Sequence, residues 1–466
     1  MFEFFKKSKK LTRVHVVGVG GIGVSRIAFY YRALGLQVTG SDLYESEITT
    51  RLRDAGVQVT IGHSEKNVPE KCNLLVFSVA IAPDNPERVT ATKRKIKQLS
   101  HFQAIQQIAQ GKKIIAVCGT NGKSTTTAML GFIFERAGLD PTVFVGSLVS
   151  QWQGNIRIGK GPYFIVEADE LDRQFLSLKP FGIVITNIEL DHLDSFRDLR
   201  DIRDAYSSFV GLLPKDGFLV FNHDDTVTME VVNLIKLENM SGFGRQGRSI
   251  HLLHSSVLAS KQHIATKVHG VEQEFTLSIA GSHNVYNALA AIGAASSAQI
   301  PFKLIQETLE EFKGIWRRFE ILGFMGKALI ISDYGHHPSA VRTTLEGARE
   351  FFPGKKILLV FQPHQLQRTR ALFDDFVSVL SEEAADGIIL VEIFQVAGRE
   401  NSAVSVSSRD LALAVSRNLP EVYYAPTLGA AEAKIRSLAP AYDLIIVMGA
   451  GDVYTVAERL VEKKHE

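Results

Sequence analysis

Short apolar runs recur along the chain, and most are followed by a glycine or polar turn and then by apolar side chains at helical spacing. Near the N-terminus this pattern predicts strands over residues 14–17, 36–39 and 74–78, with a helix that carries Ile27, Tyr31 and Leu34 after the first of them. Strands that alternate with helices are typical of parallel α/β sheets. The first part of the chain is therefore predicted to be Rossmann-like.

A second series of strands is predicted over residues 114–118, 164–166, 183–186 and 218–221. Between residues 250 and 279 the apolar positions alternate in short segments, which predicts a small antiparallel patch. An alanine-rich helix over 284–298 follows. This part is predicted to be a parallel sheet with an antiparallel addition.

A third series of strands is predicted over residues 328–332, 357–361, 387–391 and 444–447, after a break at Gly314. This part is again predicted to be Rossmann-like. A length of 466 residues suits three domains at about 150 residues each. We predict domains over residues 1–108, 109–313 and 314–466, and we expect the basic stretch 93–97 to approach the first linker.

Composition narrows the classes of function. The formal net charge is only +2, which argues against nucleic acid as a partner. No apolar run approaches the roughly 18 residues of a membrane span, and the first residues lack the apolar segment of a signal peptide, so no stable membrane insertion is expected. Only Cys72 and Cys118 occur, both in apolar runs, which argues against a disulfide framework and fits a cytoplasmic protein.

A phosphate-binding loop is predicted where the strand 114–118 meets the next helix. Successive backbone N–H groups there can face a polyphosphate such as ATP, Lys123 can neutralise it, and the Ser124 hydroxyl can bind Mg²⁺. The common pattern places its first glycine at the position of Val117, whereas the glycine here is at 119. The loop comprises Gly119, Thr120, Asn121, Gly122, Lys123, Ser124 and Thr125.

A second glycine turn, with glycines at 18, 20, 21 and 23, follows the first strand, and Asp42 stands at a distance suited to a ribose hydroxyl. This pattern alone is equally compatible with a dinucleotide and with a UDP-sugar, and a purely structural turn is a third interpretation. The glycines concerned are Gly18, Gly20, Gly21 and Gly23.

Polar residues at further strand ends supply candidate metal ligands. Glu167 and His192 each follow a predicted strand, and strand ends of a parallel sheet converge on one edge. There they can hold Mg²⁺ with Ser124, although a helix-capping glutamate and a surface histidine are the alternatives. His336 and His337 suggest zinc, but neighbouring side chains on an extended loop diverge, and no cysteine or second spaced pair supports that interpretation.

Asn284 and Asn287 share one face of the predicted helix, where their amides can bond ligand and loops. Capping of the helix N-terminus is an almost equally good account of Asn284.

Taken in order, these motifs resemble the Mur ligases over nearly the whole chain. The resemblance rests on the two glycine loops and on residues 167–170, 186–192, 283–287, 317–319, 333–338 and 361–364. It implies an N-terminal domain for a UDP-sugar, a central ATPase domain and a C-terminal domain for an amino acid. The implied reaction in peptidoglycan synthesis activates the carboxylate of UDP-N-acetylmuramate as an acyl phosphate and joins it to L-alanine. A monomer or homodimer is expected.

The resemblance also implies residue roles. Lys123 holds the ATP phosphates, Ser124 and Glu167 hold one Mg²⁺, and His192 holds a second. The nucleotide site is completed by Asn284 and Asn287, and Arg318 and Asp333 close the C-terminal domain over it. The amino acid is oriented by Tyr334, His336 and Arg368.

This sequence departs from the alanine-adding pattern in the phosphate loop and beside the amino-acid site. Asn121 and Ser124 replace a histidine and a threonine, and Gln365 replaces an arginine that helps to bind the amino acid's carboxylate. A related ligase that adds another amino acid or a murein tripeptide is thus the nearest alternative. An NAD-dependent dehydrogenase and a non-catalytic nucleotide-binding regulator are the other two, and the second phosphate loop with its carboxylates disfavours both.

Overall fold

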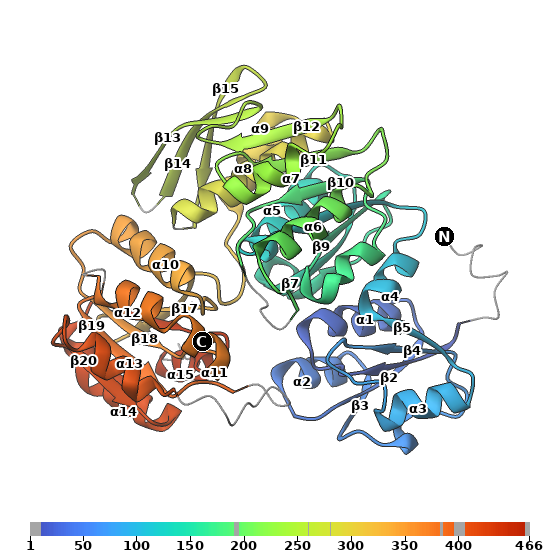
Figure 1. Ribbon diagram of the computed structural model, residues 1–466, viewed down its shortest axis with the longest axis horizontal. Coiled ribbons are helices and arrows are strands. Elements are labelled where there is room, and N and C mark those ends of the chain that lie inside the picture. The colour runs from blue at the N-terminus through green and yellow to red at the C-terminus, as the bar shows by residue number, and fades with distance from the viewer. Residues whose placement is uncertain are drawn as a thin grey trace. The chain divides into compact units, whose positions relative to one another are not determined.

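A computed structural model describes residues 11–190, 195–259, 261–279, 281–382, 385–395 and 406–461. The chain forms two compact units. The first comprises Met1–Leu253, Thr266–Gln273 and Tyr286–Thr308, and the second comprises His254–Ala265, Glu274–Val285 and Leu309–Glu466. Helices cover both faces of each parallel sheet, which confirms the predicted α/β class (Figure 1).

The first sheet contains five parallel strands in the order β3-β2-β1-β4-β5. The strands are β1 (Arg13–Val17), β2 (Gln37–Asp42), β3 (Gln58–Ile61), β4 (Leu74–Phe77) and β5 (Lys97–Ser100). The connecting helices are α1 (Ile22–Ala33), α2 (Glu47–Asp54), α3 (Pro86–Lys93) and α4 (His101–Ile108). The expectation that residues 93–97 approach a linker was wrong, because they end α3 and begin β5 inside this sheet.

The second sheet runs in the order β15-β14-β13-β12-β11-β10-β6-β9-β7-β8. Its central strands are β6 (Lys113–Cys118), β7 (Thr142–Val149), β8 (Gly154–Arg157), β9 (Tyr163–Glu167), β10 (Gly182–Ile185), β11 (Phe218–Asn222) and β12 (Met240–Gly244). All but the β7–β8 pair run parallel among these neighbours. The helices are α5 (Lys123–Arg136), α6 (Leu199–Val210), α7 (Thr226–Val232), α8 (Ser282–Ser297) and α9 (Phe302–Glu311).

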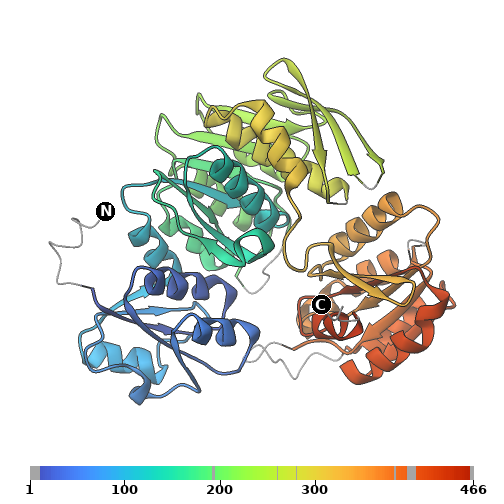
Figure 2. The same ribbon diagram turned by 180° about the vertical axis from the view of Figure 1, so that it is seen from behind.

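The predicted antiparallel patch is a meander of three strands at one edge of this sheet (Figure 2). It consists of β13 (Ile250–Leu258), β14 (Lys261–Val268) and β15 (Val271–Leu277). A two-residue loop, His269 and Gly270, joins the last two strands, and both residues have positive φ angles of 47° and 87°. Such a loop can join only antiparallel neighbours, because a parallel pair needs a long crossover.

The first and second sheets share one hydrophobic core. Buried residues of α1, including Tyr30 and Tyr31, belong to the same cluster as Phe144 of β7 and Phe164 of β9. The rings of Tyr30 and Phe144 meet edge to face at 6.0 Å between centroids. Helix α1, which begins at the N-terminal glycine turn, is therefore packed against the sheet that carries the phosphate loop.

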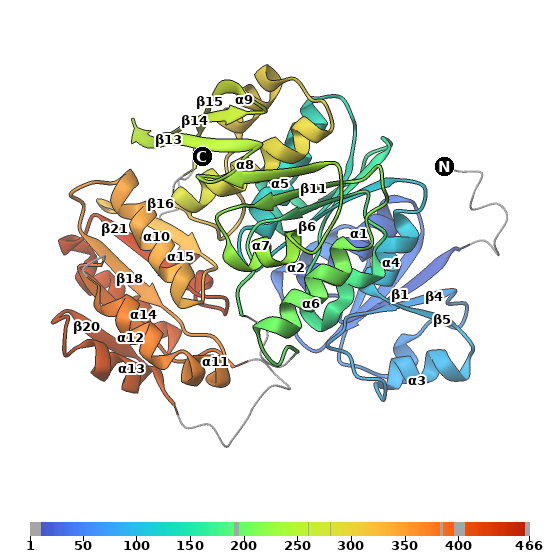
Figure 3. The same ribbon diagram turned by 45° about the horizontal axis from the view of Figure 1, so that its top comes forward.

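The third sheet runs in the order β16-β17-β21-β18-β19-β20. Figure 3 labels β16, β18, β20 and β21 among these strands. Its strands are β16 (Glu320–Met325), β17 (Ala328–Asp333), β18 (Ile357–Phe361), β19 (Gly387–Val391), β20 (Val422–Ala425) and β21 (Leu444–Met448). Only β16 is antiparallel to its neighbour. The helices are α10 (Pro338–Phe351), α11 (Leu366–Ala371), α12 (Phe373–Ser381), α13 (Ser408–Val415), α14 (Leu428–Leu438) and α15 (Tyr454–Leu460). Within the described residues, no helix is long and apolar enough to cross a membrane.

Candidate active site

The phosphate loop lies between the ends of two strands that flank β6. Val117 pairs with Glu167 of β9, and Cys118 pairs with Ile185 of β10. Residues 119–122 then lead into α5, whose N-cap is Gly122. Side chains that follow β9 and β10 are therefore placed on the two sides of the loop, as the convergence of parallel strand ends predicts.

Glycine is required at two loop positions because neighbouring side chains come too close for any Cβ. Gly119 has a φ of +130°, and a Cβ there would overlap the Thr186 hydroxyl oxygen. Gly122 has a φ of +82°, and its Cβ would overlap Oδ1 of Asn287. Val117, where the common pattern has glycine, is instead a fully buried strand residue, which explains the shifted position.

Residues after β10 hold the loop in shape. The backbone N–H groups of Thr120 and Asn121 donate to the carbonyl and to Oδ1 of Asn187, both at 2.9 Å. The Thr186 hydroxyl donates to the Asn121 carbonyl at 2.6 Å. The Asn121 side chain donates to Oε1 of Glu189 at 3.3 Å. The asparagine that departs from the alanine-adding pattern is thus built into the loop's own hydrogen bonding.

Lys123 turns back toward the loop. Its Nζ donates to the Gly119 carbonyl at 2.6 Å and lies 3.3 Å from Oε2 of Glu170. Burial alone would lower the pKa of Lys123, but Glu170, Asp169 and Glu167 outweigh it and raise that pKa. The lysine is therefore protonated at neutral pH. The sequence marked Glu167 but not Glu170 as a partner in this site, although both belong to one four-residue motif.

Oxygen donors suited to Mg²⁺ stand beside the lysine. Glu167 ends β9 and its Oε2 accepts from the Gly146 N–H at 2.6 Å, while Ser124 is buried in the first turn of α5. A hydroxyl and a carboxylate are the hard ligands that Mg²⁺ takes together with nucleotide phosphates. The described residues contain no group of three or more His, Cys, Asp and Glu side chains that could hold a metal by themselves. His192, the other predicted ligand, lies outside the described residues.

The N-terminal glycine turn is held by Asp42 at the end of β2. Its Oδ2 accepts from the Gly20 N–H at 2.8 Å and its Oδ1 accepts from the Leu43 N–H at 2.8 Å. Gly18 donates to the Ser41 carbonyl at 2.8 Å, and Gly21 is the N-cap of α1. Asp42 therefore shapes the turn through backbone contacts.

The two asparagines of α8 are both buried. Oδ1 of Asn287 accepts from the Thr126 hydroxyl at 3.3 Å, which places Asn287 against the first turns of α5. The helix begins at Ser282, so Asn284 lies inside its first turn and is not the N-cap. Asn284 therefore does not occupy the N-cap position that the capping interpretation assumes.

Asp333 ends β17 in the second unit and binds the backbone just before β16 and just after β17. Its Oδ2 accepts from the Phe319 N–H at 2.8 Å and its Oδ1 accepts from the Gly335 N–H at 2.6 Å. The Arg318 guanidinium lies 4.9 Å from the centroid of the Tyr334 ring. The sequence did not single out Arg317, which is buried and donates to the Gly451 carbonyl at 3.0 Å.

The predicted amino-acid residues are linked through His364. The His336 ring lies 5.3 Å from the His364 ring and 5.4 Å from the Tyr334 ring, between centroids. Arg368 Nη1 donates to Nδ1 of His364 at 3.2 Å. Gln365 between them has a φ of +68°. Tyr334, His336 and Arg368 are thus brought together in the second unit.

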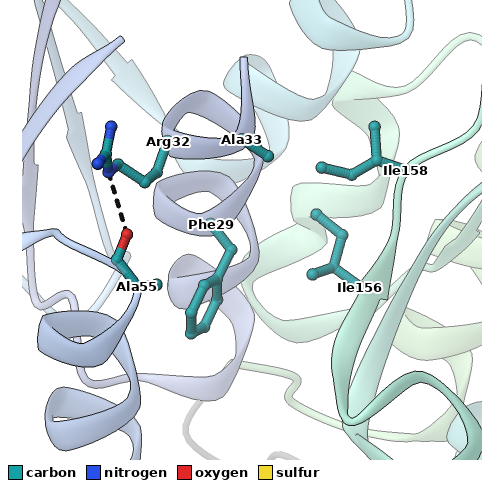
Figure 4. Close-up of a pocket in the computed structure, with 6 residues that line it drawn as sticks. All are labelled: Phe29, Arg32, Ala33, Ala55, Ile156 and Ile158. Atoms are coloured by element: carbon teal, nitrogen blue, oxygen red, sulfur yellow. Dashed lines mark hydrogen bonds between the residues drawn. The ribbon is translucent and has the colours of Figure 1, made fainter. Parts of the chain in front are cut away.

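An apolar pocket of about 580 Å³ lies elsewhere in the first unit (Figure 4). None of the predicted site residues lines it. Its walls come from α1, the end of α2 and β8, and its lining residues are Phe29, Arg32, Ala33, Ala55, Ile156 and Ile158.

Models of three families match successive parts of the chain. They are described as "Mur ligase family, catalytic domain" for residues 13–113, "Mur ligase middle domain" for 117–295 and "Mur ligase, glutamate ligase domain" for 317–451. The chain belongs to the Mur ligase family. The predicted resemblance is confirmed, and the glycine turn belongs to a Mur ligase and not to an NAD-dependent dehydrogenase.

Relatives of this Mur ligase match it over its whole length. UDP-N-acetylmuramate--L-alanine ligases of Alkaliphilus metalliredigens and Geotalea uraniireducens are each 36% identical, over 100% and 97% of this chain and 100% and 98% of theirs. The crystal structure of the UDP-N-acetylmuramate-alanine ligase from Thermotoga maritima superposes with a TM-score of 0.82 at 28% identity, covering 96% of this chain and 98% of that one. A murein peptide ligase from Psychrobacter arcticus, 23% identical with a TM-score of 0.70 over 96% and 98% of the two chains, shares the fold.

Proposed function

We propose that this Mur ligase joins L-alanine to the carboxylate of UDP-N-acetylmuramate in peptidoglycan precursor synthesis, with conversion of ATP to ADP and phosphate. The observation that carries the proposal is the full-length identity of 36% to ligases of that name. The phosphate loop and its lysine supply the ATP chemistry that the reaction requires. The three predicted domains, with boundaries after residues 108 and 313, and a cytoplasmic monomer or homodimer are part of the same proposal.

ATP is assigned to the loop at residues 119–125. Its N–H groups and the N-terminus of the 14-residue helix α5 provide a positive end for the phosphates. We propose that Lys123 exchanges the Gly119 carbonyl for a phosphate oxygen when ATP binds. Asn287 stands against Gly122 and Thr126, where it can contact the nucleotide from α8, and we assign Asn284 to the same site.

The sugar carboxylate attacks the γ-phosphorus of ATP, and ADP leaves with the bond between the β,γ-bridging oxygen and phosphorus broken. The amine of L-alanine then attacks the acyl carbon, phosphate leaves, and the amine proton is lost. A carboxylate is inert toward amines until one oxygen becomes part of such a leaving group. Positive charge near the phosphates is essential because two anions must meet in the first step.

We assign Mg²⁺ to Ser124 and Glu167, with His192 at a second ion. When bound, the ions would neutralise phosphate oxygens and align ATP for attack. Replacing Glu167 with Gln or His192 with Ala should raise the Mg²⁺ concentration needed for half-maximal phosphate release. Mg²⁺ titrations that match those of the unmodified enzyme for both variants would refute the assignment.

The UDP-sugar is assigned to the N-terminal glycine turn and Asp42, and the amino acid to Tyr334, His336 and Arg368. Arg368 carries the fork of donors that a carboxylate accepts in pairs. A different amino acid or a murein tripeptide is the second candidate substrate, because Gln365 stands where the resemblance implies an arginine.

The assignment is tested by the release of phosphate from ATP in the presence of UDP-N-acetylmuramate, with a panel of amino acids and a murein tripeptide supplied one at a time. We expect L-alanine to give the highest kcat/KM and a product whose mass equals the sum of the two substrates less one water. A higher kcat/KM with any other amine would replace L-alanine as the substrate. Release that no amine stimulates would refute the ligase reaction.

A further inference from the structure

Arg26 is a buried cation, and one of its terminal nitrogens has no hydrogen-bonding partner in the part of the chain that the structure describes. The side chain is only 4% exposed, and its Nε donates to the Gly23 carbonyl at 3.0 Å. Among the described residues, Nη1 has no hydrogen-bond partner. Burial of an unpaired charge is expensive. Such an arrangement indicates that an anion completes the site.

His101 lies close to Arg26, beside Gly23. It begins α4 and is 9% exposed. A Cβ at Gly23 would lie 3.7 Å from Nη2 of Arg26 and 3.9 Å from Nε2 of His101, so both groups stand over this glycine. Nδ1 of His101 also lacks a partner within the described part of the chain. Burial lowers the pKa of His101 to about 4, with the nearby positive charge of Arg26 as the second cause. The positive charge of these two side chains therefore comes from Arg26.

Arg26 lies within electrostatic reach of carboxylates of the phosphate site. Glu167 and Asp169 both act electrostatically on the buried Arg26. The guanidinium carbon also lies 5.8 Å from the centroid of the Phe144 ring on β7. Asn155 of β8, 1% exposed, donates to the Ile22 carbonyl and to the Ser25 hydroxyl, both at 3.1 Å, and so fixes the first turn of α1 against the second sheet.

We propose that Arg26, over Gly23 and beside His101, binds the carboxylate of the sugar substrate. This proposal rests on the proposed function, because that reaction brings a carboxylate from the N-terminal glycine turn to the phosphate site. The carboxylate approaches Glu167 and Asp169, which repel it. A guanidinium at this point offsets the repulsion and offers N–H donors to the carboxylate oxygens.

The test compares two sugars that differ in the carboxylate. UDP-N-acetylglucosamine has the nucleotide, diphosphate and amino sugar of UDP-N-acetylmuramate but lacks the lactyl carboxylate. Dissociation constants for both are measured by calorimetry on the full chain, without ATP, for the unmodified protein, Arg26→Met and Arg26→Lys. Arg32→Met is the matched control, because Arg32 lies on the same helix, is exposed, and donates to the Ala55 carbonyl.

We expect Arg26→Met to weaken binding of UDP-N-acetylmuramate by about 10- to 100-fold, the loss of a hydrogen bond to a charged group, and to leave UDP-N-acetylglucosamine binding unchanged. Arg26→Lys keeps the positive charge and should weaken the binding of UDP-N-acetylmuramate less than Arg26→Met does. Arg32→Met should alter neither constant. Methionine removes a buried charge, so the fold should survive; if it does not, Arg26→Lys carries the same comparison.

Equal weakening of both sugars would overturn the proposal, because Arg26 would then serve the diphosphate or the fold. Unchanged binding of both would overturn it as well, since the guanidinium would then be satisfied by water or by the neighbouring carboxylates. Failure of the unmodified protein to bind either sugar would refute the proposed function itself and the inference with it.

Discussion

Nζ of Lys123 lies 3.3 Å from Oε2 of Glu170 and 2.6 Å from the Gly119 carbonyl oxygen, so the loop and a buried carboxylate hold the lysine in place. These two acceptors take two of the three N–H donors of the Lys123 ammonium. In the function proposed above, ATP exchanges the Gly119 carbonyl for a phosphate oxygen. The next two predictions concern substitutions at Lys123 and at Gly122 of this loop.

Lys123→Ala should lower the rate of phosphate release by a factor on the order of 10²–10³, because it removes one preorganised charge from the transferring phosphoryl group. The double variant with Glu170→Gln is the stability control, since Glu170 is buried and loses its lysine in the single variant. Steady-state phosphate release is the measurement. Near-normal turnover of Lys123→Ala would contradict the ATP assignment of this loop.

Gly122→Ala should impair ATP binding for two reasons. The alanine is strained at this positive φ angle, and its Cβ also overlaps Oδ1 of Asn287. Gly111→Ala is the matched control. Gly111 has a similar φ of +79° with no atom within 4 Å of its Cβ position, so it reports the strain alone, about 1 kcal/mol. ATP affinity and melting temperature should be measured for both. Equal effects of the two substitutions would show that the contact with Asn287 is unimportant.

Glu87 binds side chains of two strands of the first sheet, His15 of β1 and Ser41 of β2. We expect it to make the stability of the enzyme depend on pH in the acid range. Burial alone would raise the pKa of Glu87, but hydrogen bonds from His15, Ser41 and Asn67 outweigh it and lower that pKa to about 2. A carboxyl with a lowered folded pKa contributes stability that is present above its unfolded pKa, near 4.5, and is lost as the pH falls toward 2.

Glu87→Gln should therefore destabilise the protein at neutral pH by up to about 3 kcal/mol. The difference from the unmodified protein should shrink as the pH falls from about 4.5 to about 2. Urea unfolding midpoints at several pH values measure it. A difference that stays constant across this range would contradict the charged state assigned to Glu87.

Gln365→Arg should lower the KM for L-alanine, because it adds a charge-assisted contact worth about 1.5–3 kcal/mol beside Arg368. Arg368→Ala should raise that KM and leave ATP binding unchanged. The parent enzyme should show a high KM for L-alanine. If Gln365→Arg abolishes activity and another amino acid is the better substrate of the parent, the pocket serves a different amine.

Much of the fold was predictable because buried parallel strands are continuous apolar runs. The predicted strands over 357–361 and 387–391 coincide with β18 and β19. Strand β16 was missed because several of its side chains are half-buried or exposed and a register shift interrupts it between Ile321 and Gly323. The formation of β16 depends on its pairing with β17, which the local sequence of β16 does not reveal.

The placement of Lys123, Ser124 and Glu167 was predictable, because each lies at or soon after the end of a strand and strand ends converge on one edge of a parallel sheet. The contact of Glu170 with Lys123 and the electrostatic interaction of Arg26 with Glu167 were not, because folding brings these side chains together. Asp42 has contacts that its distance in sequence from the glycine turn did not indicate. Both of its oxygens accept backbone N–H groups of or beside that turn, which fixes the carboxylate in place.

The central claim is that the chain activates the sugar carboxylate with ATP and then transfers it to L-alanine. The most direct measurement uses UDP-N-acetylmuramate with ¹⁸O in the lactyl carboxylate and follows the label by mass spectrometry of product and phosphate. We predict one ¹⁸O atom in each phosphate released and one in each amide formed, because the oxygen that attacks phosphorus departs with it. Unlabelled phosphate, or phosphate released without the L-alanine amide, would contradict the account.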